Sequence, residues 1–432
     1  MSAPVVIGAG LAGSEAAWAL AQRGVAVTLC EMRPEKYTPA HHTAGFAELV
    51  CSNSLKAMRL GSAAGLLKAE MAHMGSLIVE AAKATAVPAG GALAVDRERF
   101  SAYVTEKIRS HPLITVRQGE VTEIPAEGDV IIATGPLTSD ALSKAIAACT
   151  GHEGLHFFDA AAPIVEADSI DLTKAFRAAR YGRGDDDYIN CPMNKAEYEA
   201  FYDALVSAER APLHDVDRVD VYEGCMPVEI LAARGHDSIR YGPLKPVGLT
   251  DPRTGHRPWA VVQLRTENAD GTMYNIVGFQ TNLKFPEQKR VFSLIPGLEN
   301  AEFVRYGVMH RNTFLDSPRL LDRHLRLKRD PRIRFAGQIT GVEGYIESAA
   351  TGILTGIDLA RERAGKPPVD LPATTMLGAL TRYAADETVR DFQPMGCNMG
   401  ILPPLDVNIR NKQERYLAVA ERAMRDLAAT DI

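Results

Sequence analysis

Short apolar runs alternate with helix-length segments through the first third of the chain. Residues 5–7 form an apolar strand pattern, residues 11–23 a helical pattern, and residues 25–31 a second apolar strand. Apolar runs of this length next to glycine are typical of buried strands, and their alternation with helices predicts an α/β fold. Similar segments follow, with helical patterns at 63–83 and 96–109 and an apolar strand at 129–132.

The turn between the first strand and the first helix has the spacing G-x-G-x-x-G. The first glycine permits a tight turn, the second lets the backbone approach a pyrophosphate, and the third lets helix and strand pack closely. The amides at the helix start then face the phosphates. Glu31 ends the second strand, near the spacing expected for an acid that binds a ribose. The segment therefore predicts a dinucleotide site formed by Gly8, Ala9, Gly10, Leu11, Ala12, Gly13 and Glu31.

Two later segments favour FAD over a nicotinamide as the bound dinucleotide. The strand at 129–132 ends in Ala-Thr-Gly, which places Thr134 and Gly135 at a turn beside the expected cofactor. A strand at 333–335 leads into a turn with Gly337 and Gly341 and then into a helix of small residues at 346–356. Small residues let a helix start approach a cofactor closely. We therefore expect these distant segments to meet on one FAD.

The middle of the chain has a different pattern. Stretches at 259–264 and 273–279 alternate in polarity, which predicts antiparallel strands, and the strand-helix pattern returns after Phe335. The expected fold is a Rossmann-like FAD-binding domain with a smaller inserted α+β domain. The expected parts are the first FAD-binding portion at 1–150, an inserted substrate or RNA domain at 151–304, the completing FAD-binding portion at 305–375, and a C-terminal helical segment at 376–432.

Composition narrows the function classes. The 432 residues are 46% hydrophobic and 24% charged with a net charge of −6, which is ordinary for a globular protein of two domains. We expect no membrane segment, because no apolar run approaches the length of a span. The six cysteines lack metal-ligand spacing, so we expect no metal site and a reduced, cytoplasmic setting.

Two of the cysteines lie in segments that suggest chemistry. Cys51 precedes the run Ser-Asn-Ser, which predicts a helix cap and hence a thiol near a helix start. Cys225 lies between Gly224 and a nearby Pro227, which is typical of a loop that presents a functional group.

At these residues the chain closely resembles the folate- and flavin-dependent tRNA (uracil-5-)-methyltransferases, the TrmFO family, which are related to the GidA flavoproteins. The resemblance covers nearly the whole length. It includes the segments at 6–18, 31–34, 48–56, 87–98, 169–182, 223–229, 242–249, 277–290, 305–318 and 341–352.

The resemblance implies an activity and its partners. It implies transfer of a one-carbon unit from 5,10-methylenetetrahydrofolate, through FAD and with NAD(P)H as reductant, to C5 of a uridine in the tRNA T-loop. A cysteine thiolate would add to C6 of the uracil and activate C5. On this resemblance Cys225 is the activating thiolate, Cys51 a second thiol beside the flavin, and His310 the ring that stacks on the folate, although the sequence fits either order of the two cysteines.

Three alternatives remain open at this stage. The same chemistry could act on a ribosomal RNA uridine, the chain could be a simple NAD(P)H-dependent flavin oxidoreductase, or it could bind RNA with FAD as a structural ligand. The densest basic run, residues 319–334, could contact RNA phosphates or could be a solvated loop. Arg177, Arg180 and Arg183 form a second basic patch. Cys397 is a less expected candidate for an additional catalytic thiol.

Overall fold

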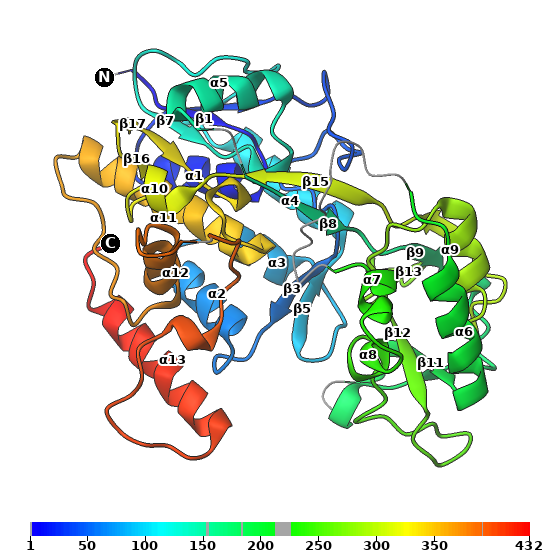
Figure 1. Cartoon of the computed structure of the whole chain (residues 1–432). Helices are drawn as coiled ribbons and strands as arrows, with labels where there is room; N and C mark the ends of the chain where they lie inside the picture. Colours follow the sequence, from blue (N-terminus) through cyan, green and yellow to red (C-terminus); the bar gives the residue numbers. More distant parts are fainter. Residues whose placement is uncertain (1, 153–154, 183–184, 212–225, 391) are drawn as a thin grey trace.

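The structure is a computed structural model that describes residues 2–152, 155–182, 185–211, 226–390 and 392–432 (Figure 1). It contains two six-stranded sheets, each with its own hydrophobic core. The first sheet lies near the N-terminus and the second at the opposite side of the molecule (Figure 1).

The first sheet combines strands from both ends of the chain. Its order is β16-β17-β7-β1-β2-β6, and all neighbours are parallel except β16 with β17. Strands β1 and β7 are buried apolar runs, as parallel strands covered on both faces require. The bounds are β1 (Val5–Ile7), β2 (Val27–Glu31), β6 (Ile114–Gln118), β7 (Val130–Ile132), β16 (Arg326–Leu327) and β17 (Asp330–Phe335).

Two helices from opposite ends of the chain pack closely against each other beside this sheet. Helix α1 (Leu11–Gln22) follows β1, and α11 (Tyr345–Arg363) follows β17. A Cβ at Gly352 would lie 2.1 Å from the Ala12 carbonyl oxygen, and a Cβ at Gly356 would lie 2.6 Å from that of Ala16. The small residues predicted at 346–356 therefore allow this helix contact.

The second sheet is antiparallel, in the order β10-β11-β12-β13-β9-β14. Helices α6 (Lys195–Ser207) and α9 (Phe285–Phe292) pack against it through Phe201 and Phe292. The strands are β9 (Ile164–Glu166), β10 (Phe176–Arg177), β11 (Tyr188–Met193), β12 (Ala260–Thr266), β13 (Met273–Ile276) and β14 (Phe303–Arg305).

A two-stranded ribbon extends between the two sheets, formed by β8 (Leu155–Ala160) and β15 (Met309–Phe314) in antiparallel register (Figure 1). A smaller sheet has the order β3-β5-β4, with β3 (Ser54–Ala57), β4 (Ala86–Val87) and β5 (Ala92–Val95). The remaining helices are α2 (Ala63–His73), α3 (Leu77–Ala84), α4 (Arg97–Ser110), α5 (Asp140–Thr150), α7 (Val228–Ala233), α8 (Ser238–Tyr241), α10 (Ser317–Leu320), α12 (Met376–Ala384) and α13 (Lys412–Ala428).

Two predicted elements differ from the structure. The helical pattern at 63–83 is two helices, because Gly75 takes a positive φ of 84° and Ser76 caps the second helix by accepting from the Val79 amide. The strand predicted at 273–279 ends at Ile276, two residues before Gly278, whose φ is 80°.

The α/β fold class is otherwise as predicted. We retain the division into a discontinuous FAD-binding domain, an inserted domain and a C-terminal segment as a proposal, since the first sheet joins strands on either side of the second. Within the described residues, none of the helices combines the length and apolarity needed to cross a bilayer.

The contact between α1 and α11 gives a stability prediction. We expect Gly352→Ala to lower the free energy of unfolding by about 1–2 kcal/mol. A Cβ only 2.1 Å from a backbone oxygen places the overpacking cost in the upper half of its usual range of about 1–3 kcal/mol, and roughly 1 kcal/mol is regained in helix propensity. Gly91→Ala is the control, since a Cβ there meets no atom within 4 Å. Thermal unfolding of both cofactor-free variants tests this, and equal midpoints would contradict it.

Candidate active site

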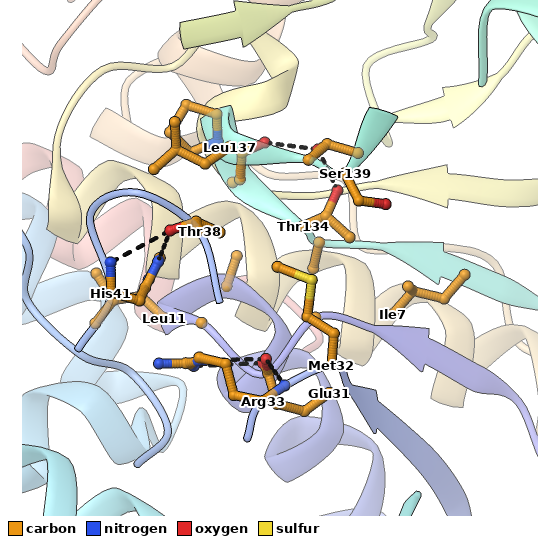
Figure 2. A pocket seen from close by; sticks show the side chains of 18 of the residues that line it. Ile7, Leu11, Glu31, Met32, Arg33, Thr38, His41, Thr134, Leu137 and Ser139 are labelled. Atoms are coloured by element: carbon orange, nitrogen blue, oxygen red, sulfur yellow. Dashed lines mark hydrogen bonds and ion pairs between the residues drawn. The ribbon is translucent and has the colours of Figure 1, made fainter. Parts of the chain in front are cut away.

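A hollow lies at the carboxyl ends of the parallel strands (Figure 2). Ligands of open α/β sheets bind at this edge. The hollow is lined by the turn after β1, the end of β2, the turn after β7, and the start of α11. Segments more than 300 residues apart in sequence therefore form one site.

The glycine turn after β1 forms the floor of this hollow. Gly8 has a φ of 97°, and a Cβ at Gly13 would lie 1.7 Å from the Gly8 carbonyl oxygen, so both positions need glycine for the turn itself. Gly10 differs, because a Cβ there meets no atom within 4 Å and would project into open space. No described side chain caps α1, whose first amides face the hollow.

Glu31 lies in the hollow, and its carboxylate is held by Arg33. The Glu31 Oε1 accepts from the Arg33 amide and Nε, each at 3.0 Å, and Oε2 accepts from the Ala9 amide at 2.9 Å. Burial alone would raise the pKa of Glu31, but the hydrogen bonds and charge of Arg33 outweigh it and lower the pKa. The Glu31 carboxylate is therefore ionised, and a ligand in the hollow would bind a carboxylate that Arg33 already contacts.

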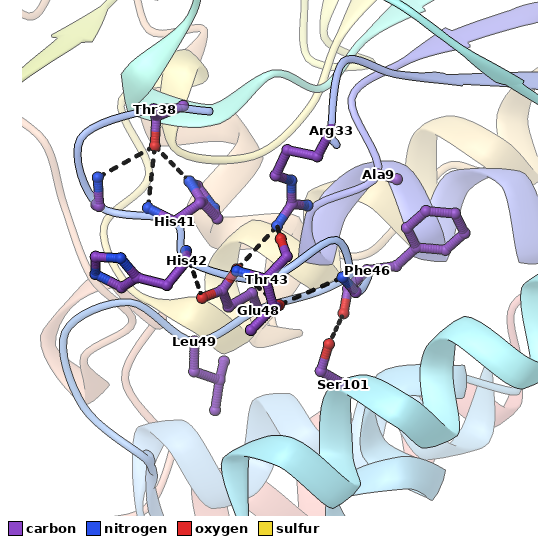
Figure 3. A network of polar contacts seen from close by, with 12 residues as sticks. Ala9, Arg33, Thr38, His41, His42, Thr43, Phe46, Glu48, Leu49 and Ser101 are labelled. Carbon is purple, nitrogen blue, oxygen red and sulfur yellow. Dashed lines mark hydrogen bonds and ion pairs between the residues drawn. The ribbon is translucent and has the colours of Figure 1, made fainter. Parts of the chain in front are cut away.

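Arg33 also organises the loop that follows β2 (Figure 3). Its Nη1 donates to the Thr43 carbonyl at 3.2 Å and to Glu48 Oε2 at 3.0 Å. The Glu48 carboxylate in turn accepts from the amides of His42 and Thr43. Thr38 and His41 of the same loop line the hollow, and burial lowers the pKa of His41 to about 4, so its ring is neutral. The loop leads directly to Cys51.

Cys51 contacts the first residue of α11. The Tyr345 hydroxyl lies 2.9 Å from the Cys51 Sγ and accepts from the amides of Cys51 at 2.8 Å and Ser52 at 3.2 Å. Burial raises the pKa of Tyr345 well above its usual value, so the hydroxyl keeps its proton. Because the hydroxyl oxygen accepts from two amides, its proton is available to the sulfur. Tyr345 lines the hollow, which places Cys51 at its rim.

Arginines gather around the same thiol. Arg97 donates to Glu267 Oε2 at 2.5 Å and to the Leu49 carbonyl at 2.6 Å. Burial lowers the pKa of Arg305 to about 10, with Arg97 adding to the effect and Glu267, Tyr345 and Cys51 opposing it. Arg305 is thus charged at neutral pH and lies within electrostatic reach of Cys51.

Comparisons with known proteins agree with this site. The family model described as glucose inhibited division protein A matches residues 4–367. The methylenetetrahydrofolate--tRNA-(uracil-5-)-methyltransferase TrmFO of Desulforamulus reducens is 61% identical over 97% of this chain and 95% of its own length, and that of Geobacter sulfurreducens is 59% identical over 98% of each. The chain belongs to the GidA family and to its TrmFO members. The fold matches GidA of Aquifex aeolicus with a TM-score of 0.71 at 18% identity, over 99% of this chain and 72% of that one.

The predicted resemblance to the TrmFO family is thereby confirmed. Eight of the predicted dinucleotide residues line the hollow, namely Gly8, Gly10, Leu11, Ala12, Glu31, Thr134, Gly135 and Gly337. Ala9 and Gly13 lie directly behind them, in the hydrogen bond to Glu31 and in the turn. Gly341 instead packs against Phe392, with a φ of 76°.

The side chains of two other predicted site residues, Cys225 and His310, lie outside the described part of the structure. Cys225 lies outside the described residues, which resume at Met226. The backbone of His310 belongs to β15 and pairs with Asp159 of β8, but its side chain lies outside the described ones.

The predicted helix cap after Cys51 is wrong. The Ser-Asn-Ser run leads into strand β3, because the Asn53 amide group donates to the Val95 and Thr266 carbonyls instead of a helix end. Cys51 nevertheless lies near a helix start, that of α11, which is 294 residues away in the sequence.

Cys397 has surroundings that oppose its ionisation. Its amide donates to Glu347 Oε1 at 3.0 Å. Burial, and then the Glu347 carboxylate, raise the pKa of this thiol despite the nearby charge of Lys56. The structure therefore disfavours Cys397 as an additional catalytic thiolate.

The basic run at 319–334 is largely neutralised within the chain. Arg323 lies 3.1 Å from Asp370, Arg326 bonds Asp322 and Glu362, and Lys328 bonds Glu387 at 2.6 Å. Arg334 is buried against Glu362. These pairs favour a structural role for the run over phosphate binding. Among the described residues no cluster of His, Cys, Asp and Glu is arranged for a metal ion.

Sequence reasoning missed Tyr345, Arg97 and Arg305. None of them belongs to a local sequence pattern that marks a site, and each comes near Cys51 only through tertiary packing. All three, like Arg33 at 31–34, lie within segments that resemble the family (87–98, 305–318 and 341–352), but that resemblance alone does not single them out.

The Tyr345 hydroxyl gives a prediction about thiol reactivity. We expect Tyr345→Phe to raise the pH at which Cys51 becomes reactive toward iodoacetamide, because the sulfur loses its hydroxyl donor. Peptide mass spectrometry across a pH series would follow Cys51 separately from the other thiols. Tyr383→Phe, which removes a hydroxyl bonded to the Gln393 carbonyl, is the control. An unchanged Cys51 profile would rule out the hydroxyl's role.

Proposed function

We propose that this chain is the methylenetetrahydrofolate- and FAD-dependent enzyme that forms 5-methyluridine in the T-loop of tRNA, with NAD(P)H as reductant. The observation that carries the proposal is the identity of about 60% over nearly the whole chain with TrmFO proteins, together with a dinucleotide hollow that has a cysteine at its rim. The protein acts in the cytoplasm, where tRNA is modified.

The hollow is suited to FAD. The space above Gly10, which a Cβ would enter, and the uncapped start of α1 suit a pyrophosphate. Thr134, Gly135 and Gly337 also line the hollow. Bound FAD supplies the carrier and redox chemistry for the one-carbon unit.

The chain's own residues then activate the uracil. Cys225 adds its thiolate to C6, which gives C5 carbanion character, and loss of the thiolate after C5 has reacted restores the ring double bond. Cys51 receives the C5 proton, with its sulfur oriented by Tyr345. His310 stacks on the pteridine of the folate.

Single-turnover methyl transfer tests the activity. We expect FAD-loaded protein with NADPH and labelled methylenetetrahydrofolate to label T-loop thymine in unmodified tRNA, and Cys225→Ala and Cys51→Ala to lose at least about 100-fold in rate, as removal of a covalent catalyst or proton acceptor does. Label in ribosomal RNA alone would move the target to that RNA. NADPH oxidation without label in either RNA would leave a simple flavin oxidoreductase.

The floor of the hollow gives a separate test of the cofactor site. We expect Gly10→Ala to retain less FAD through gel filtration, because the added methyl group enters the space above the turn. The thermal midpoint of the cofactor-free variant should equal that of the wild type, since the methyl group meets no protein atom. Undiminished FAD retention would place the pyrophosphate elsewhere.

A further inference from the structure

Two N–H donors of the Arg305 guanidinium group are buried and lack a hydrogen-bond acceptor among the described residues. Arg305 ends β14, the edge strand of the second sheet, and these donors are its Nε and Nη2 atoms. These two N–H groups point the same way and form the guanidinium edge that binds two oxygens of one carboxylate or phosphate. Buried charged donors without an acceptor are costly, so this edge indicates a ligand with two neighbouring oxygens.

The surroundings favour an anion. Arg97 is neutralised by Glu267, whereas Arg265 donates to the neutral side chains of Ser52 and Asn53 in the loop of Cys51. Among the described groups near Cys51, the three guanidinium groups of Arg97, Arg265 and Arg305 therefore face one carboxylate, that of Glu267. The Arg305 side chain is partly exposed as a whole, and a change of its rotamer would be needed to present the two buried donors to a ligand from solution.

The neighbouring residue, Tyr306, contributes the middle ring of a column of three parallel aromatic rings. The rings of Phe303 and Tyr306 are 4.9 Å apart and 10° from parallel, and those of Tyr306 and Phe285 are 4.8 Å apart and 16° from parallel. Phe285 ends the column and is 51% exposed. Rings of this kind stack with bases of single-stranded nucleic acid, and arginine binds the phosphates between them.

We propose that Arg305 binds a phosphate of the RNA substrate beside Cys51, while a neighbouring base stacks on Phe285. The inference rests on the proposed function. A nucleotide phosphate suits the position better than a folate carboxylate does, because the phosphates flank the reacting uridine, whereas the glutamate tail lies at the far end of folate from its one-carbon unit.

Binding of unmodified tRNA transcript to the FAD-loaded full chain, without folate or NADPH, tests this. We expect Arg305→Met to weaken binding about tenfold or more and to lower the slope of log Kd against log salt by about one. Arg305→Lys should keep the slope and lose part of the affinity, because the charge remains and the two-donor edge does not. Phe285→Ala should weaken binding by about fivefold or more.

The thermal midpoint separates ligand binding from a structural role. Arg305→Met should have an unchanged or higher midpoint, because it removes a buried charge without partners. Arg363→Gln is the control, because its Nε and Nη2 already bind Asp129 and it lies at the opposite end of α11 from Tyr345. Its tRNA affinity should equal that of the wild type.

Two results would overturn the proposal. One is wild-type tRNA affinity and salt slope in Arg305→Met and Arg305→Lys. The other is weaker binding of methylenetetrahydrofolate by these variants with unchanged tRNA binding, which would assign the edge to the folate carboxylate. Methyl transfer by the wild type is measured in parallel, so that failure of the proposed function is recognised separately from failure of this inference.

Discussion

The close contact between α1 and α11 is the constraint on which the site depends. The backbone of Ala12 and Ala16 lies where a Cβ at Gly352 or Gly356 would be, so the two helices approach to backbone contact. This approach brings the glycine turn after β1 and the start of α11 to the same hollow. It also places Tyr345, which contacts Cys51, in the lining of this hollow. A wider helix spacing would separate the cofactor hollow from the thiol.

The site depends secondly on Glu31, whose carboxylate binds both the turn after β1 and Arg33. This carboxylate joins the β1 turn, through the Ala9 amide, to Arg33 (Figure 2). Arg33 continues through Glu48 into the loop before Cys51 (Figure 3). A charged group in the hollow is thus connected by hydrogen bonds to the backbone that carries the thiol. Three charged side chains, those of Glu31, Arg33 and Glu48, therefore join the hollow to the Cys51 loop.

The parts predicted from sequence were those with local causes. The β1 turn, Glu31 and the small-residue helix after β17 follow from backbone geometry within one segment, and each was placed correctly. The helix expected after Cys51 was wrong because Asn53 bonds carbonyls of β5 and β12, which no local pattern reveals. Tyr345, Arg97 and Arg305 were missed for the same reason, since each meets Cys51 only after the chain has folded.

The surroundings of Cys51 differ from those of Cys30, Cys191 and Cys397 in the balance between burial and nearby donors and charges. Burial raises the pKa of Cys30 and of Cys191, the latter to about 12, and the Glu347 carboxylate adds to burial at Cys397. Cys51 instead has a protonated hydroxyl at 2.9 Å and two arginines within electrostatic reach. Positive charge and a hydroxyl donor both stabilise a thiolate over a thiol. The fold therefore makes this cysteine chemically competent by the groups that it gathers from α4, β14 and α11, and not by the residues next to it in the sequence.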